Sequence, residues 1–347
     1  MESFSPRKLL VLCGLLLFWL GLPSCGLILG SDEHVAMSSA RTFEFSFEVT
    51  VPAEVSENPE PIRLWVPVPI SDHAQIVELL NAPEGVSWST PDVHGNRFGY
   101  LQWELGMPAT MTWTWRVHRM QDLGSPDYGD RFAAEEIVMQ NYLDSDLGVP
   151  VRGAAAEIAR EVAASVEPID FSRALYDRVL ADMRFDTSGS GPGHGSTDWA
   201  VSEGYGDSTD YQAFYISASR SNMIAARFQV GYLLPLERGR GDITDVHSWN
   251  HIYQQGTGWF PMDLALADQD PIRTDYFYGH LTTNRIAISC GRDIQLDPIQ
   301  SGGGLSFVQK PYAEQGGLDV PVLVRTHFQD LPTLTSLRPN TEYGIWP

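Results

Sequence analysis

Hydrophobic and polar residues alternate strictly in the segment that follows residue 40. Every second residue is apolar there, and the apolar set is Phe43, Phe45, Phe47, Val49 and Val51. A period of two places these side chains on one face of a β-strand. The same alternation recurs at residues 62–68, 101–105 and 111–117. We therefore predict an antiparallel β domain over residues 41–135, in which 101–105 and 111–117 form a hairpin.

The hydrophobic period lengthens after residue 150. Apolar residues recur at helical spacing over 154–166, and every fourth residue from Phe171 to Met183 is apolar behind Asp170, a suitable N-cap. We predict two helices here, then a loop over the glycine-rich residues 189–195, which lack the Gly-Lys-Ser/Thr of a phosphate-binding loop. The pattern predicts an α+β domain over residues 136–295 and a β extension over 296–347, with a strand at 320–324.

Composition indicates a globular protein with an acidic surface. Of 347 residues, 43% are hydrophobic and 11% aromatic, which is enough for a packed core. Lys and Arg number 23 against 44 Asp and Glu, so the net charge is -21. This balance opposes binding to nucleic acid or to anionic lipid.

The N-terminus has the form of an export signal. Arg7 and Lys8 precede an apolar run over residues 9–22, and Leu-Pro-Ser-Cys at 22–25 resembles a bacterial lipobox, in which Cys25 would carry the lipid. Ordinary cleavage near residue 30 is an alternative. A third is an uncleaved anchor, because residues 9–29 supply the roughly 20 residues that span a bilayer. All three predict an exported protein of the bacterial cell envelope, membrane-anchored or periplasmic.

Cysteine usage predicts no disulfide framework. The three cysteines are Cys13 and Cys25, at the N-terminus, and Cys290. A processed chain would keep little to pair with Cys290. We interpret Cys290 as a small buried hydrophobic residue and not as a nucleophile.

Ser208 is predicted to lie at a helix N-terminus. Tyr211, Phe214, Tyr215 and Ala218 follow it with the spacing of one helix face. The unpaired N–H groups and positive dipole of such an end stabilise a nucleophile and an oxyanion. The alternative is an ordinary cap, since Ser, Thr and Asp are preferred there.

His247 and Asp263 are predicted to meet across a second hairpin. If the strands are symmetric about Gln255, residue 249 faces Pro261 and residue 247 faces 263. Because Pro261 has no N–H, these pairs are of the non-hydrogen-bonded kind, with Cα atoms about 4.5 Å apart unless a bulge shifts the register. A carboxylate placed there can orient the imidazole. A purely structural pair is the alternative.

Residues 204–263 together resemble the transglutaminase-like superfamily. The matching segments are Gly-Tyr-Gly-Asp-Ser at 204–208, Arg220, Ala-Arg at 226–227, Gly-Tyr at 231–232, His-Ser-Trp at 247–249 and Gly-Trp-Phe-Pro-Met-Asp at 258–263. The run over residues 142–186 is also similar. The resemblance implies a papain-like fold and a triad in the order Cys, His, Asp, with Ser208 in the place of the cysteine. Met223 and Ala225 depart from a usual glycine and a usual proline.

The serine leaves two functions open. A serine must give its proton to His247 during attack, whereas a cysteine can wait as a thiolate. The chain is either a pseudoenzyme whose cleft binds a peptide, protein or cell-wall glycan segment, or an amide-bond hydrolase or acyl transferase with a Ser208-His247-Asp263 triad. The resemblance implies Trp199 as an oxyanion donor, and we expect His194 and Trp249 to line the cleft. We expect no cofactor and no metal: no zinc motif or EF-hand is present, and bacterial relatives generally need no calcium.

Overall fold

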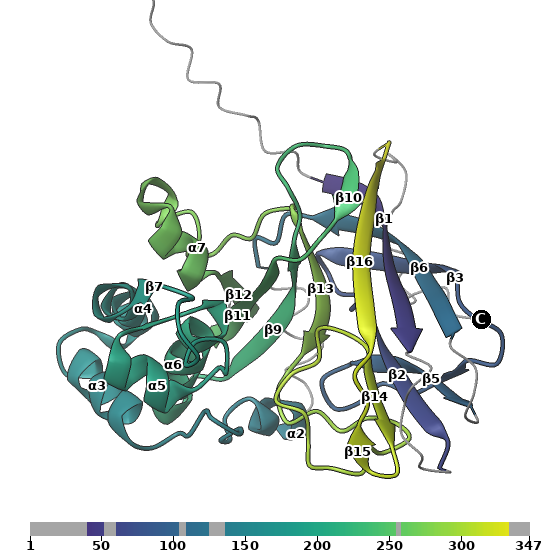
Figure 1. The fold of residues 1–347 in the computed structure, drawn as a ribbon. Coiled ribbons are helices and arrows are strands. Elements are labelled where there is room, and N and C mark those ends of the chain that lie inside the picture. The colour runs from purple at the N-terminus through teal and green to yellow at the C-terminus, as the bar shows by residue number, and fades with distance from the viewer. Residues whose placement is uncertain (1–39, 52–59, 104–108, 125–135, 255–257, 333–347) are drawn as a thin grey trace, which may run out of the picture. The chain divides into compact units, whose positions relative to one another are not determined.

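The computed structural model describes residues 40–51, 60–103, 109–124, 136–254 and 258–332. The predicted signal, with Cys25, therefore lies outside the described residues. Within them, the strands form two five-stranded antiparallel sheets, one four-stranded antiparallel sheet and a short parallel pair, β7 (Arg184–Phe185) with β8 (Tyr205–Gly206). Helices pack beside the four-stranded sheet (Figure 1). The α+β prediction is confirmed.

The first five-stranded sheet combines both ends of the described chain. Its order is β10 (Arg240–Asp242), β16 (Leu323–Leu331), β1 (Ala40–Val51), β6 (Ala109–Met120) and β3 (Gln75–Asn81). The predicted apolar stripe of β1 is fully buried, and its exposed fractions are 0–1%. The strand predicted at 320–324 begins three residues later, at Leu323. Segment 296–347 therefore contributes an interior strand, β16, next to β1.

The second five-stranded sheet corrects the predicted first hairpin. Its order is β15 (Leu318–Asp319), β14 (Tyr312–Gln315), β2 (Ile62–Val68), β5 (Arg97–Trp103) and β4 (Ser87–Trp88). Strand β5 pairs with β2 and β4, whereas β6 pairs with β1 and β3 in the other sheet. The prediction that 101–105 and 111–117 pair with each other is wrong. Apolar and polar residues alternate along both strands because each strand has one buried face. This alternation does not reveal which strand is the partner.

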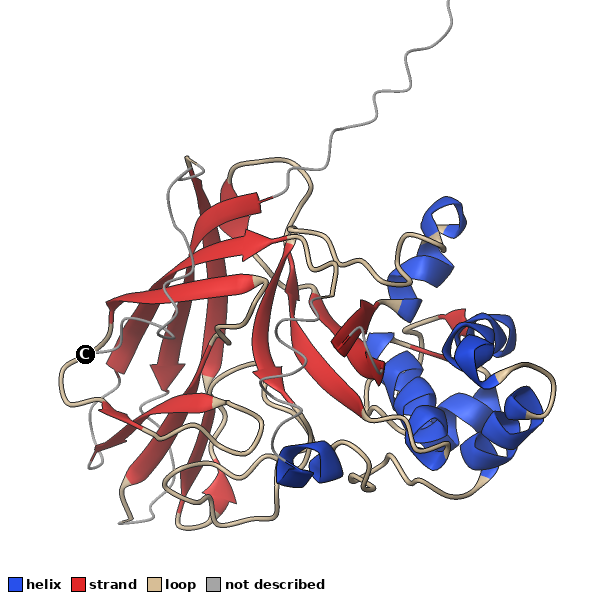
Figure 2. Cartoon of the chain, turned by 180° about the vertical axis from the view of Figure 1, so that it is seen from behind, coloured by secondary structure: helices blue, strands red, loops and turns tan. Residues whose placement is uncertain are grey.

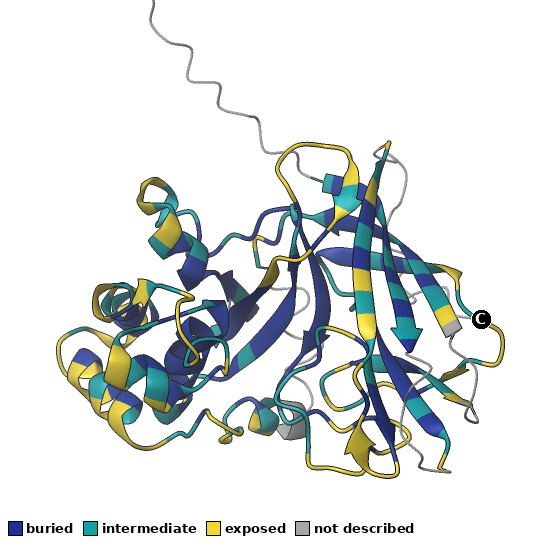
Figure 3. Ribbon diagram, viewed as in Figure 1, coloured by how far each residue is buried: buried dark blue, intermediate teal, exposed yellow. Residues whose placement is uncertain are grey.

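The helices surround a central helix next to the four-stranded sheet (Figure 2). The sheet order is β12 (Gly258–Met262), β11 (Val246–Gln254), β9 (Ala226–Leu233) and β13 (Arg285–Cys290). The α-helices are α2 (Glu136–Asn141), α3 (Ala154–Ala163), α4 (Phe171–Asp182), α5 (Thr197–Glu203), α6 (Ser208–Ser221) and α7 (Leu264–Gln269), with 3-10 turns η1 (Pro168–Asp170) and η2 (Pro271–Arg273). The helices predicted at 154–166 and 171–183 are confirmed as α3 and α4. Helix α6 is buried along thirteen of its fourteen residues (Figure 3).

Two buried side-chain amides join β13 to the two five-stranded sheets and their loops, which are called the β-rich part below. Gln75 Nε2 donates to the Ala287 carbonyl at 2.9 Å and its Oε1 accepts the Ala287 N–H at 2.9 Å. Asn96 forms the same pair of hydrogen bonds with Cys290, at 2.7 and 2.8 Å. Each amide acts like the backbone of a neighbouring strand and satisfies buried N–H and C=O groups. Strand β13 is thereby held by β9 through strand pairing and by these two amides.

No helix of the described segments is long and apolar enough to cross a membrane.

Candidate active site

Ser208 is the first residue of helix α6, as predicted, and a capping box fixes this end of the helix. Asp207 is the N-cap, and its Oδ1 accepts the Thr209 N–H at 2.7 Å. Asp210 Oδ2 in return accepts the Asp207 N–H at 3.1 Å. The backbone N–H of Ser208 has no acceptor one turn earlier in the helix. The helix N-terminus therefore provides a donor beside the Ser208 side chain, which is itself buried.

The Asp210 carboxylate also fastens the glycine-rich segment to the start of α6. It accepts the N–H groups of Gly193 at 2.8 Å and of Ser196 at 3.2 Å. Burial raises the pKa of Asp210, although these backbone hydrogen bonds favour the charged form. Segment 193–196 is thus tied to the residue two positions after Ser208.

The Ser208 hydroxyl contacts the strand that carries His247. Its Oγ accepts the backbone N–H of Ser248 in β11 at 3.1 Å. Gln212, one turn further along α6, links to the same strand through the Ser248 carbonyl at 3.3 Å and the Asn250 side chain at 2.6 Å. The first turns of α6 are therefore fixed against the residues that follow His247.

His247 and Asp263 form a buried hydrogen-bonded pair. His247 Nε2 lies 2.9 Å from both Asp263 oxygens. Burial would raise the pKa of Asp263, but the charges of His247 and Arg285 outweigh burial and hold that pKa below its usual value. The carboxylate is therefore ionised near neutral pH, and Nε2 must be the donor. In the neutral ring this leaves the proton acceptor at Nδ1.

The predicted hairpin register is wrong by two residues, yet the contact it predicted is present. His251 pairs with Pro261 and Tyr253 with Trp259, where 249 with 261 and 251 with 259 were predicted. The turn residues 255–257, with Gln255, lie outside the described residues. A shift of two keeps every side chain on its face of the sheet. Asp263 follows the last residue of β12 and reaches His247 diagonally.

Asp263 receives two further hydrogen bonds. As the N-cap of α7 it accepts the Leu266 N–H on Oδ1 at 3.1 Å. Its Oδ2 accepts a hydrogen bond from Nη1 of Arg285 at 2.9 Å. Arg285 lies in β13 and belongs to none of the motifs selected from the sequence. The carboxylate is thus held by a histidine, a helix N-terminus and a buried arginine.

Three predicted site residues have other partners. The Trp199 indole N–H donates to the Tyr205 carbonyl at 3.0 Å, so in this structure it is directed at the backbone, and its role toward an oxyanion stays a prediction. Trp249 is fully buried and donates to Gln229 Oε1 at 2.7 Å, so it belongs to the core and does not line a cleft. His194 is exposed and donates from Nε2 to the Ser190 carbonyl at 3.1 Å.

Cys290 packs in the interior, as predicted. It is buried, and its Sγ lies 3.9 Å from the Tyr142 hydroxyl. Burial raises the pKa of the thiol. A thiol of this kind is a poor nucleophile at neutral pH.

Met223, which stands where the family pattern has a glycine, adopts a backbone conformation that favours glycine. Its φ angle is 60°, in the left-handed region that favours glycine. The side chain is 77% exposed, so no packing compensates for this conformation. The usual glycine at this position is therefore explained by the turn between α6 and β9, and Ala225 in the same turn is buried.

A second buried group of ionisable residues joins β11 to the β-rich part. Asp122 Oδ1 lies 2.7 Å from His73 Nε2, and Oδ2 lies 2.8 Å from Nε2 of His251, which is on β11. Burial, followed by repulsion from Arg227, lowers the pKa of His251 to about 4. Burial lowers the pKa of His73, but the Asp122 charge outweighs burial and raises it overall.

In the described segments, no group of three or more His, Cys, Asp or Glu side chains has the arrangement of a metal site.

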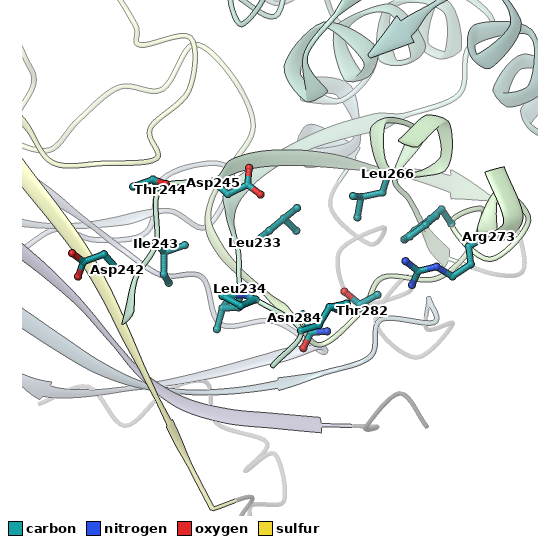
Figure 4. Close-up of a pocket in the computed structure, with 13 residues that line it drawn as sticks. Leu233, Leu234, Asp242, Ile243, Thr244, Asp245, Leu266, Arg273, Thr282 and Asn284 are labelled. Atoms are coloured by element: carbon teal, nitrogen blue, oxygen red, sulfur yellow. The ribbon is translucent and has the colours of Figure 1, made fainter. Parts of the chain in front are cut away.

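A groove of about 400 Å³ adjoins the residues that hold Asp263 (Figure 4). Its apolar wall includes Leu233, Leu234, Leu266 and Phe277, and the exposed Asp245 lies at its edge. The wall is part of the site's framework, because the Leu266 N–H binds the Asp263 carboxylate. The Asp263 N–H also donates to the Phe277 carbonyl at 3.1 Å. Asp245 precedes His247 by two residues.

A helix-end hydroxyl, a strand histidine and an aspartate at the next helix cap define a papain-like arrangement. Residues 156–264 match the model of the transglutaminase-like superfamily, so this part of the chain is a transglutaminase-like domain. Arg285 lies beyond the matched segment.

Solved structures resemble the chain at low sequence identity. A protein from Cytophaga hutchinsonii, provisionally described as a cysteine protease, superposes with a TM-score of 0.56 at 16% identity, covering 86% of this chain and 94% of its own. The periplasmic domain of TgpA from Pseudomonas aeruginosa, bound to ethylmercury, has a TM-score of 0.38 at 16% identity, with coverage of 68% and 93%. No curated protein matches the sequence. The first comparison supports the fold of the chain.

Proposed function

We propose that this chain is an exported transglutaminase-like protein that binds a peptide segment without cleaving or transferring it. The observation that carries the proposal is the partner of Ser208: its Oγ accepts the Ser248 N–H. Among the described contacts, no hydrogen bond joins this hydroxyl to His247. Serine attack requires a base that takes the hydroxyl proton. A hydroxyl aligned on a backbone amide instead suits recognition.

The groove beside Asp263 suggests which part of a peptide is recognised. Leu233, Leu234, Leu266 and Phe277 give it an apolar wall. Leu236, which also lines it, is 70% exposed and available for contact. Such a groove suits one apolar side chain of an extended peptide, with the neighbouring backbone directed toward Ser208.

The second candidate is an amide-bond hydrolase or acyl transferase. It is favoured by the His247–Asp263 pair, in which His247 Nε2 lies 2.9 Å from Asp263 Oδ1 and the pKa of the carboxylate is lowered. In this function Ser208 attacks, His247 acts as base and then as acid, Asp263 orients the ring, and the Ser208 N–H stabilises the oxyanion.

Binding and turnover measurements on one set of variants separate the two functions. We would use fluorescein-labelled seven-residue peptides with a central Leu, Phe or Ala. We expect Leu and Phe peptides to bind more tightly than the Ala peptide, Ser208→Ala to bind like the native protein, and Leu236→Glu to weaken binding at least about fivefold. Leu318→Glu is the matched control, because Leu318 is 72% exposed and lies on β15, away from the groove.

The same peptides also test the hydrolase function. Mass spectrometry should find neither cleavage nor amine transfer with the native protein. Turnover that disappears in Ser208→Ala would contradict the proposal and establish the Ser-His-Asp function. Equal binding of the Leu and Ala peptides would contradict the role given to the groove.

Export and membrane attachment are part of the proposed function, and they rest on Arg7, Lys8 and the apolar run after them. We expect the full chain, expressed in a bacterium, to fractionate with the cell envelope. Cys25→Ser should release it into a soluble fraction, whereas the matched variant Cys13→Ser should not. Native protein that is already soluble in the periplasm would contradict lipidation, and a cytoplasmic protein would contradict export.

A further inference from the structure

Three charged side chains line the groove of about 400 Å³, and two of them have a charge of opposite sign beside them (Figure 4). The three are Asp242, Asp245 and Arg273. Asp242 receives a hydrogen bond from Arg325 at 2.9 Å, and Arg273 Nε lies 2.6 Å from Asp270. Asp245 is exposed, and within the described segments its carboxylate has no hydrogen-bond or ion-pair partner. The unmatched charge of the groove lining is therefore negative.

The backbone of Asp245, directly before β11, is fixed although the side chain is exposed. The Leu233 N–H donates to the Asp245 carbonyl at 3.0 Å, beside the first paired residue of β11. The Val246 N–H donates to the Thr244 carbonyl at 3.0 Å, which closes a three-residue turn centred on Asp245. Because both hydrogen bonds hold the backbone, the carboxylate moves only by rotation of its side chain.

The Asp245 carboxylate faces the same space as the apolar wall of the groove. Figure 4 shows the side chains of Asp245 and Leu233 next to each other, with Leu266 and Arg273 across the groove. His247 follows Asp245 by two residues. A ligand side chain that packs on the apolar wall is therefore flanked by Asp245 where the chain leads to the histidine of the site.

The charge of the whole chain acts in the same direction as Asp245. The net charge is -21, so the protein attracts cations from a distance. Salt screens this attraction beyond about 10 Å at 0.1 M ionic strength, and it cannot select one position within a peptide. Asp245 provides a local charge that can. Lysine and arginine also have long apolar stems, which can lie along the wall while the charged end reaches the carboxylate.

We propose that Asp245 is a specificity-determining residue, which selects peptides that carry a lysine or arginine within two residues of the apolar side chain. The inference rests on the proposed function, because it names the class of peptide that the groove recognises. The wall binds the apolar residue, and the basic neighbour adds an ion pair with Asp245 at the rim. Water screens such a pair, so the expected gain in affinity is about threefold.

Peptides that differ only in the flanking residue provide the test. We would use fluorescein-labelled seven-residue peptides with a central Leu and with Lys, Gln or Glu two positions before or after it. The native protein should bind a Lys peptide about threefold more tightly than the Gln peptide, and the Glu peptide more weakly than both. In Asp245→Asn the Lys peptide should bind like the Gln peptide. In Asp245→Lys the order of the Lys and Glu peptides should reverse.

Glu84→Lys is the matched control. Glu84 is exposed in the turn between β3 and β4, and it does not line the groove. This variant changes the net charge by the same amount as Asp245→Lys, so it should keep the preference for the Lys peptide. An equal loss of preference in both variants would show that the net charge attracts the peptide, and the role of Asp245 would be wrong.

The remaining outcomes separate this inference from the proposed function. If the Leu peptides bind alike whatever their flanking charge, the role of Asp245 is wrong, whereas binding of an apolar side chain by the groove stands. A preference for the Glu peptide would assign the dominant charge to Arg273 and would also overturn the inference. If no Leu peptide binds, both the inference and the proposed function are wrong.

Discussion

Replacing Asp122 by alanine should lower the free energy of unfolding by about 3–5 kcal/mol at pH 7. The Asp122 side chain is 1% exposed and accepts hydrogen bonds from His73 and His251. It also accepts the Gly124 N–H at 3.0 Å. Alanine would leave these donors unpaired in the interior and would remove the carboxylate that connects β11 to the β-rich part. Urea unfolding followed by tryptophan fluorescence measures the loss.

Asp242→Ala is the control for this prediction. Asp242 also stands between a cation and a histidine, with Arg325 Nε at 2.9 Å and His327 Nδ1 at 3.0 Å. This carboxylate is 47% exposed, so water screens the interactions and replaces them when they are lost. We expect no measurable change in stability. If Asp122→Ala lowers the free energy of unfolding as little as Asp242→Ala does, Asp122 does not hold β11 to the β-rich part.

The local elements of the fold were predictable because their patterns are local. The stripe from Phe43 to Val51 needs only the alternation of side chains across a strand, and α3 and α4 need only helical spacing. The pairing of strands was not predictable in the same way. Strands β5 and β6 follow each other in the chain and both alternate, but they lie in different sheets. Pairing is decided by how the two sheets cover their shared core.

The site shows the same division. Ser208, His247 and Asp263 lie within 56 residues, in a helix end and a hairpin that can be read from spacing. The error in the hairpin register did not affect the predicted contact of His247 with Asp263. A shift of two residues keeps each side chain on the same face of the sheet. Arg285 and Asp122 could not be found, because neither belongs to a motif. Arg285 reaches Asp263 only through the docking of β13, and Asp122 reaches His251 across 129 residues of chain.

Side-chain direction was the other missing information. Trp199 and Trp249 are both near the site in the sequence, as a cleft would require. The spacing does not show where an indole N–H points, and in both cases a protein acceptor takes it, the Tyr205 carbonyl and Gln229 Oε1. Buried Trp N–H groups usually find such a partner. An aromatic residue beside a motif is therefore better evidence of packing than of an oxyanion donor.

Ser208→Cys should produce a reactive thiol whose apparent pKa lies below the value of about 8.5 for a free cysteine. Three features of the site stabilise a thiolate there. The positive end of α6 lies at residue 208, the Ser248 N–H is aimed at its side-chain atom from 3.1 Å, and the His247–Asp263 pair is intact. Alkylation by iodoacetamide as a function of pH, read by mass spectrometry, measures this pKa. Because residue 208 is 2% exposed, the pKa is taken from the pH dependence of the alkylation rate and not from its absolute value.

Two further variants decide whether the site or the mere presence of a thiol causes this reactivity. His247→Ala in the Ser208→Cys background should raise the thiol pKa, because the nearby proton acceptor is lost. Ser221→Cys places a thiol at the opposite, negative end of the same helix, where the dipole raises the pKa of a thiol. Cys290 is buried with a raised pKa and should contribute only a slow background. A Ser208→Cys thiol that titrates like the one at residue 221 would show that the helix end and the His247–Asp263 pair do not act on position 208. The assignment of Ser208, His247 and Asp263 as a former or present active site would then be wrong.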